Sequence, residues 1–420
     1  MAAVSLAAAG VLANSTAARA QRSGHVMAQA VPLLTRATPT AGRVSLTEGY
    51  LTQPMLGAGG ELLGGRLRGN LMLDFEGLTL RRGELNTGGY GEGYVDRRHP
   101  HTYLHEAIVS AMAAPRVAGA PLGLSLSVGR GFAPFGSDDP MVRTFVKYPV
   151  NHHLAQVLER VVAIGAARWR GVGVEGAVFN GDEPVGAADR PRWERFGDSW
   201  SGRLTIFPVG GVELAGSLAR VTSPEEPTGH GLDQRKYALT ARYERDGLYA
   251  LSEWASTEEW SPGGFAYRTG TLLAEAVLQR RPGTLGLRVE RTERPEEERA
   301  ADRFRTVRPH TDFSILGITR WTTVTLHAAP AAAAAAIPAI GLRAVPFVEI
   351  AAVHVANAGT PGVFTPTAFY GSDRLWMLSA GARVTVGGAH RRMGRYGVAE
   401  RLPAFAAPAT GMPHHEHHQH

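Results

Sequence analysis

The feature that most restricts the fold of this chain is an alternation of apolar and polar residues, which recurs from about residue 71 to residue 386. In one segment, Trp200, Leu204 and Ile206 alternate with Arg203 and Thr205, and a short Pro-Val-Gly-Gly break follows. Successive side chains of a β-strand point to opposite faces, so a period of two predicts strands with one apolar and one polar face. The breaks are alternately short and long, which indicates tight turns at one end of the sheet and loops at the other.

These strands are expected to close into a barrel that crosses a membrane. Segments of about ten residues suit a tilted strand in a bilayer, and only a closed sheet leaves no backbone group unpaired in hydrocarbon. We therefore predict an all-β fold, a transmembrane antiparallel up-and-down β-barrel of about 14 strands, in a range of roughly 12–16. The alternative is a soluble all-β protein, but an eight-stranded shell would use under half of the chain, and a propeller would show a repeat.

The two ends of the chain are predicted to lie outside the barrel. Residues 1–20 combine a small apolar stretch with an Ala-Arg-Ala site and predict a signal peptide without a basic start; a disordered alanine-rich tail is the alternative. Residues 21–65 are expected to form a periplasmic lead-in with one short strand, residues 66–388 the barrel, and residues 389–420 a C-terminal segment ending in a histidine-rich tail. Among the strands, one pair is expected at 154–164 and 169–180. Export without a helical stop-transfer segment leaves the periplasm, the outer membrane or the medium, and the barrel pattern makes the outer membrane the predicted location.

Composition excludes several classes of function. The chain has no cysteine, which rules out disulfides, thiolate metal sites and cysteine nucleophiles. The net charge of +6 comes from arginines that are dispersed rather than clustered, so nucleic acid is not an expected partner. The chain contains no H-E-x-x-H, G-x-S-x-G or P-loop pattern, so we do not expect an enzyme. An enzyme built on a barrel, as outer-membrane lipases are, would need a Ser-His pair on one outward face.

Charged residues at inward positions of the predicted strands are the first candidate functional group. In a water-filled pore they would set which ions pass, or they would pair with one another and keep the lumen wet. Positively and negatively charged residues are mixed, which favours ion pairing for most of them. The slight excess of arginine over acidic residues in the chain predicts a weak selectivity of the pore for anions. The predicted pore-lining residues are Asp74, Glu76, Arg203, Glu213, Lys236, Arg242, Glu244, Arg288, Glu290 and Arg383.

The long segment of residues 131–153 is the second candidate. If it folded into the barrel it would act as a constriction loop and filter solutes; a loop lying over the external rim is the alternative. Its predicted filtering residues are Asp138, Asp139, Arg143 and Lys147.

Histidines are the third candidate, because imidazole is a common ligand of Zn, Cu and Ni. One group lies in a predicted loop, where histidines without cysteine are more often structural, and the other lies in the C-terminal tail, which is expected to bind transition metals loosely. No other cofactor is expected. The predicted metal ligands are His99, His101, His105, His414, His415, His417, His418 and His420.

Two loop segments add a resemblance to a known family. Residues 88–101 have the sequence GGYGEGYVDRRHPH and residues 132–140 have FAPFGSDDP. With the export signal and the strand pattern of residues 66–388, they make the chain similar to Gram-negative outer-membrane porins. The resemblance implies a channel for passive diffusion of small polar or ionic solutes, with outer-membrane lipid and small solutes as partners and a homo-oligomer, a trimer, as its assembly. As a departure from it, the chain continues past Tyr396 instead of ending with an aromatic residue on the last strand.

A second function is compatible with the same barrel. The histidine-rich segments would let an outer-membrane protein handle Cu, Zn or Ni.

Overall fold

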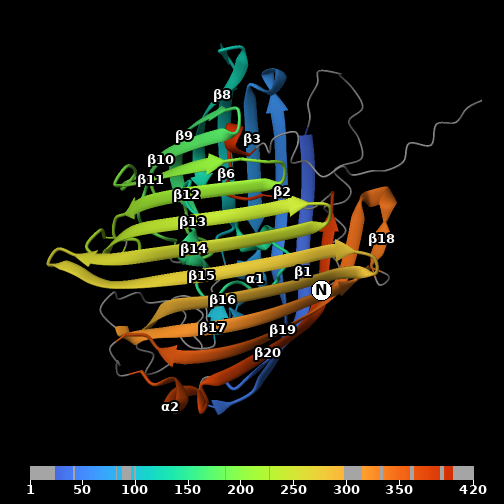
Figure 1. Cartoon of the computed structure of the whole chain (residues 1–420), viewed down its shortest axis with the longest axis vertical. Coiled ribbons are helices and arrows are strands. Elements are labelled where there is room, and N and C mark those ends of the chain that lie inside the picture. Colours follow the sequence, from blue (N-terminus) through green and yellow to red (C-terminus); the bar gives the residue numbers. More distant parts are fainter. Residues whose placement is uncertain are drawn as a thin grey trace, which may run out of the picture.

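The computed structural model describes residues 24–40, 43–81, 83–87, 96–98, 101–184, 186–226, 228–297, 315–331, 334–359, 364–387 and 392–400. Sixteen strands form one closed antiparallel barrel, shown in Figure 1, and the ring closes where the first strand pairs with the last. In ring order the strands are β1 (Gly24–Thr38), β2 (Leu46–Leu62), β3 (Leu67–Asp74), β6 (Leu104–Ala113), β8 (Ala120–Gly131), β9 (Arg160–Trp169), β10 (Val172–Phe179), β11 (Ser199–Ile206), β12 (Val212–Val221), β13 (Asp233–Arg245), β14 (Leu248–Ser261), β15 (Gly264–Arg280), β16 (Gly283–Glu297), β17 (Ile315–Pro330), β19 (Leu342–Asn357) and β20 (Arg374–Val386).

The remaining elements of the described chain are short and accompany the ring. They include the turn extensions β7 (Arg116–Val117) and β18 (Ala335–Ile337), the ribbon of β4 (Glu84–Asn86) and β5 (Asp96–Arg98), the helices α1 (Glu76–Thr79) and α2 (Pro366–Tyr370), and several single 3₁₀ turns. None of the described helices has the length and apolar character needed to cross a membrane.

The wall of the barrel has an apolar outer face, as the alternation predicts. On β13, Tyr237 and Leu239 are exposed, whereas Lys236 and Ala238, which alternate with them, are buried in the interior. The same order repeats on neighbouring strands, so large apolar side chains cover the outside. Such a surface is stable against hydrocarbon and unfavourable in water. Exposed examples on successive strands are Leu126, Val174, Leu204, Leu214, Leu239, Leu272, Leu287, Leu326, Ile350 and Leu378.

The two ends of the barrel differ in the length of their connections. Tight turns join β9 to β10, β13 to β14 and β15 to β16 at one end, where β1 also begins and β20 ends. Longer connections leave the opposite end, which we call the loop end. One hairpin departs from the predicted alternation: β14 and β15 are joined at the loop end by two residues only. These strands, yellow in Figure 1, extend beyond their neighbours.

The sixteen strands lie at the upper limit of the predicted range of roughly 12–16, above the central value of 14, and the structure corrects the assignment of residues 21–65. The first two strands of the ring, β1 and β2, come from the stretch that was expected to be a periplasmic lead-in. The alternation fails there because both faces of β1 are apolar: Val26 and Leu34 point outward, and Val31 and Leu33 pack inward. The pair expected at 154–164 and 169–180 also shifts, because β9 begins only at Arg160.

The interior of the barrel is filled by the chain itself. The connection between β8 and β9, residues 132–159, is buried inside and is called the inner loop below. A second stretch after β20, residues 392–400, also lies inside and is called the inserted segment. Near the loop end, Phe132 and Phe135 of the inner loop pack against Val162 and Phe179 of the wall, forming an apolar core.

A second apolar cluster lies under α2 at the same end. Trp321 and Tyr370 are fully buried, 6.0 Å apart between ring centroids, and pack with inward residues of β19 and β20. The loop end therefore combines apolar clusters, packed like the core of a globular protein, with buried charges such as the ion pair of Arg294 and Glu296 at the end of β16.

Candidate functional site

The inner loop crosses the barrel from β8 and β9 to the opposite wall. The backbone N–H groups of Val146 and Lys147 donate to the carboxylate of Glu349 on β19, at 2.6 and 3.1 Å. Farther along, Val150 N donates to Glu290 on β16 at 3.0 Å. Buried backbone without regular structure needs polar partners, and here wall carboxylates supply them. The loop thus lies inside the barrel and not over its rim.

Two predicted filtering residues of the inner loop are held in buried ion pairs. Arg143 contacts Glu253 on β14 at 3.3 Å and Glu275 on β15 at 3.5 Å. Lys147 Nζ lies 2.9 Å from a carboxylate oxygen of Glu84, which lies on β4. Each cation is therefore neutralised by acids of another element, and both pairs tie the loop to its surroundings.

The adjacent residues Asp138 and Asp139 have different surroundings. Asp139 Oδ1 accepts a hydrogen bond from Met141 N at 2.7 Å and so begins a 3₁₀ turn of the loop. Asp138 instead faces the inserted segment, where Arg392 Nε lies 2.8 Å and Arg395 Nε 3.3 Å from its carboxylate. Asp139 therefore shapes the loop, while Asp138 joins the loop to another part of the chain.

The charge of Asp138 is set by this arginine cluster. Burial by itself would raise the pKa of Asp138, but the guanidinium groups of Arg392, Arg395 and Arg242 outweigh burial and hold the pKa well below its usual range. The carboxylate is therefore ionised throughout the physiological pH range.

The ten predicted pore-lining residues are placed on the inner side of the wall or, for Glu76, in α1 inside it. Their charges are largely paired. Arg203 makes two hydrogen bonds of 2.7 Å to Glu175 on β10, and Lys236 donates to His153 O and Thr257 Oγ1, both at 2.9 Å. Their role in ion passage stays a prediction. The ten are Asp74 on β3, Glu76 on α1, Arg203 on β11, Glu213 on β12, Lys236, Arg242 and Glu244 on β13, Arg288 and Glu290 on β16, and Arg383 on β20.

Arginines of the far wall bind the backbone of the inner loop. Arg383 on β20 donates to the carbonyl oxygens of Arg143 at 3.0 Å and of Thr144 at 3.3 Å. Arg288 on β16 donates to Tyr148 O at 3.3 Å. Together with the wall carboxylates, these arginines satisfy both donors and acceptors of a buried loop.

The inserted segment fills the space between the inner loop and the β6–β12 wall. Arg392 lies between two carboxylates, with Nη1 2.7 Å from Glu213 on β12 and Nε 2.8 Å from Asp138. The hydroxyl of Tyr396 accepts from Phe132 N at 2.9 Å and donates to Glu106 on β6. The segment is therefore bonded to the loop on one side and to the wall on the other.

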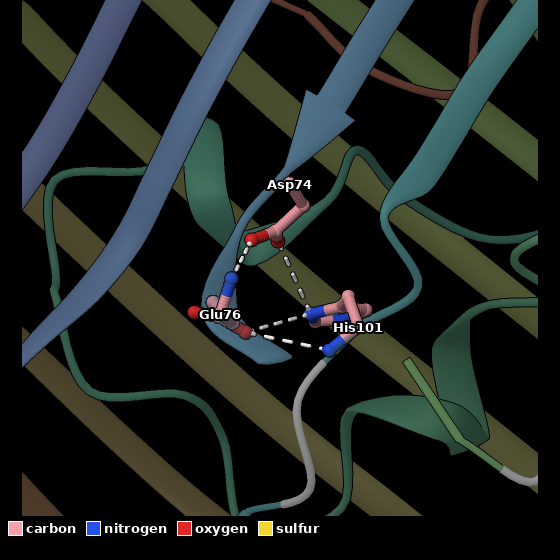
Figure 2. A group of neighbouring side chains, drawn as sticks. All are labelled: Asp74, Glu76 and His101. Carbon is pink, nitrogen blue, oxygen red and sulfur yellow. Dashed lines mark hydrogen bonds and ion pairs between the residues drawn. The ribbon is translucent and has the colours of Figure 1, made fainter. Parts of the chain in front are cut away.

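Three residues near α1 bring together atoms that bind metals. Figure 2 shows Asp74 at the end of β3, Glu76 in α1 and His101 before β6, all buried. His101 Nδ1 lies 3.2 Å from Glu76 Oε2 and 3.9 Å from Asp74 Oδ2, and the three ligand atoms lie within 4.8 Å of one another. Ligands about 2.0–2.2 Å from one Zn²⁺ ion would have similar spacing. The group combines one predicted metal histidine with two predicted pore-lining acids.

His105 is close to this group but has its own partner. Its ring lies 5.0 Å from that of His101, and its Nδ1 is 2.7 Å from Glu159 Oε1 at the end of the inner loop. Burial disfavours the ionised carboxylate of Glu159, but the bond to His105 lowers the pKa of Glu159 to about 2. His99 and the five predicted ligands in the tail lie outside the described residues.

Comparison with known proteins gives the fold. No family model matches the chain, and no curated protein matches its sequence. The structure is similar to an anion-selective porin from Comamonas acidovorans, with a TM-score of 0.53 and 12% identity over 87% of this chain and 100% of that one. The fold is that of an outer-membrane porin. Pseudomonas putida OprB is a further match, with a TM-score of 0.51 and 8% identity over 86% of this chain and 94% of that one.

Sequence reasoning missed several residues of the barrel interior. Glu175, Glu253 and Glu275 obey the same inward alternation as the predicted lining residues and could have been found from it. Arg392 and Arg395 could not, because they follow the last strand and no periodic pattern covers them.

Proposed function

We propose that this chain forms an outer-membrane channel for passive diffusion of small polar or ionic solutes. The observation that carries the proposal is a closed sixteen-stranded barrel with an apolar outer face and an inner face of charged residues. A barrel with that polarity offers solutes a polar route through hydrocarbon. The porins with a similar fold support the same activity.

The weak lean toward anions is part of this proposal. Its support is the net charge of +6 and the similarity to a porin described as anion-selective. The ten proposed lining residues, five acids and five bases, do not favour either sign. Selectivity is therefore expected to be weak.

Conductance in planar lipid bilayers tests the channel. The refolded protein, shown to be a barrel by a shift in gel mobility on boiling, should produce discrete conductance steps, and a salt gradient should give a small reversal potential of the anion-selective sign. Folded protein that never produces steps, even after the inner loop has been shortened, would rule the proposal out.

Handling of a transition metal is a second candidate, favoured by the buried group of Asp74, Glu76 and His101. Hydrogen bonds to Glu76 Oε1 from Thr52 Oγ1 and Gln53 N, both 2.9 Å, fix the position of that carboxylate. Such outer contacts orient the ligands of metal sites. The arrangement would suit Zn²⁺, Cu²⁺ or Ni²⁺.

Equilibrium binding of Zn²⁺ to the full chain tests this candidate. His101→Ala should weaken the tightest binding by more than about tenfold, whereas His354→Ala, at a half-exposed histidine on β19, serves as the matched control. Deletion of residues 412–420 should remove weaker binding and reduce metal tolerance of cells that express the protein. Unchanged binding and tolerance in both variants would exclude metal handling.

A further inference from the structure

We propose that the inserted segment, residues 392–400, is an autoinhibitory latch that must leave the barrel before solutes can pass. The inference rests on the proposed channel function. It starts from the position of the segment, which follows the last strand and yet returns into the barrel from the tight-turn end. Residues 392–397 are buried and the last three are half-buried, so the segment occupies interior space and does not cover the rim.

The contacts of the latch cross the gap between the inner loop and the wall. Arg392 and Arg395 each contact both Asp138 of the loop and Glu213 of β12. Tyr396 likewise joins the loop backbone to β6. One short stretch thus fixes the inner loop to the wall at two places, and movement of the loop requires these contacts to break.

The backbone of the latch is adapted to this tight space. Gly394 has φ of +76° and Gly397 of +57°, a region that disfavours other residues. A Cβ on Gly394 would approach the ring of Phe132, and one on Gly397 would lie 2.3 Å from Ser125 Oγ. The two glycines let the segment turn while it is pressed between loop and wall.

The bonds that hold the latch are of a kind that water can replace. Several are ion pairs and hydrogen bonds between charged or polar groups, which regain hydration when they separate, while Met393 and Tyr396 also contribute buried side chains to apolar clusters. Release would remove Arg392 and Arg395 from Glu213 and Asp138, and the Tyr396 hydroxyl from Glu106, while Arg242 would stay 3.6 Å from Asp138. The open passage should therefore attract cations more than the closed one does.

A reversible crosslink gives a direct test, because the natural chain contains no cysteine. An ideal Cβ at Gly123 on β8 lies 3.4 Å from Cβ of Val398, close to the roughly 3.5–4.5 Å of a disulfide. Gly123 has an ordinary backbone conformation, so cysteine is allowed there. The double variant Gly123→Cys/Val398→Cys should lock the latch when oxidised and free it when reduced, and each single variant is a control.

Single-channel recording on the full-length barrel is the readout. Reduction of the locked variant should raise the time-averaged conductance by more than about tenfold, which corresponds to a change of about 1.4 kcal/mol in the free energy of latch opening. Deletion of residues 392–420 should keep the channel open and shift the reversal potential toward cations. Deletion of residues 401–420 alone retains the latch and should behave like the full chain.

The outcomes separate the latch from the channel itself. If the folded 392–420 deletion and the oxidised double variant conduct as the full chain does, the latch is wrong and the channel stands. The latch is also wrong if only a variant with a shortened inner loop conducts. If every folded variant is silent, including that one, the proposed function fails.

Discussion

Replacement of Leu239 by arginine tests most directly whether the outer face of the barrel lies against the hydrocarbon of a membrane. Leu239 is the middle residue of the thirteen in β13, its side chain is 59% exposed on the outer face, and it lies beside Gly216 and Trp254 of the neighbouring strands. Six residues separate it from the end of the strand, which is about 20 Å along the strand and, at a tilt of about 45°, about 14 Å along the membrane normal. That is close to half the thickness of the hydrocarbon layer.

The position sets the expected cost of the substitution. Arginine on the lipid face costs about 2–4 kcal/mol at the midplane and about 0–1 kcal/mol near an interface. Leu248→Arg is the matched control, because Leu248 is also outward but begins β14 beside the tight turn. The difference between the two variants should be about 2–3 kcal/mol.

Urea unfolding of the protein in lipid vesicles, followed by tryptophan fluorescence and by gel mobility, measures this difference. Leu239→Ala separates the loss of apolar area from the added charge. Equal costs for the two arginine variants would refute the placement of β13 across the bilayer. A cost near zero for both would mean that the outer face does not meet hydrocarbon.

Three further changes test the interior. Although burial opposes it, neighbouring arginines keep the pKa of Asp138 well below 3.8, so its stabilisation of the inserted segment is complete above that pH and is lost as the pH falls below it. Hydrogen exchange in residues 392–397 should therefore accelerate on acidification. Asp138→Asn should reduce this dependence without abolishing it, because Glu213 contacts the same two arginines. Gly136→Ala should lower the free energy of unfolding by more than about 2 kcal/mol, because φ of Gly136 is +61° and the new Cβ would lie 1.8 Å from Ala155 O. The control Gly69→Ala, at a residue with open space around it, should leave the free energy of unfolding nearly unchanged in the same urea titration. Glu349→Gln should cost about 1–3 kcal/mol by weakening the bonds from two loop N–H groups, and limited proteolysis should then cut the inner loop faster; an unchanged cleavage rate would contradict that role.

The wall of the barrel could be predicted from the sequence because one rule governs it. Each strand through a bilayer must place apolar side chains on the lipid side. The period of two around Leu204, Leu239 and Leu287 therefore predicts the strands that contain them. The rule fails for β1, because its inward side chains Val31 and Leu33 are apolar like its outward ones. The sequence of β1 therefore shows no alternation of apolar and polar residues. The strand count was low for that physical reason.

The interior could be predicted only in part. Inward positions such as Arg203 and Glu290 follow from the alternation, but their partners do not, because the partners belong to segments that are distant in sequence and have no period. Glu290 accepts a hydrogen bond from the inner loop, and Glu213 pairs with arginines beyond the last strand. The group of Asp74, Glu76 and His101 illustrates the same limit, because the sequence predicts His101 as a metal ligand but assigns its two neighbours to the pore.

The pairing of β1 with β20 has a consequence for the order in which the molecule matures. The first strand to be synthesised completes its hydrogen bonds only with the last, so the ring stays an open sheet until nearly the whole chain is present. The inner loop, anchored between β8 and β9, must be enclosed as the sheet curls around it. Residues 392–400 follow the closing strand and can take their place only in a chamber that already exists. The final event of assembly would then be the insertion of residues 392–400 into a barrel that is already closed. Failure of that step would leave a folded barrel with an unfilled interior, and not an unfolded chain.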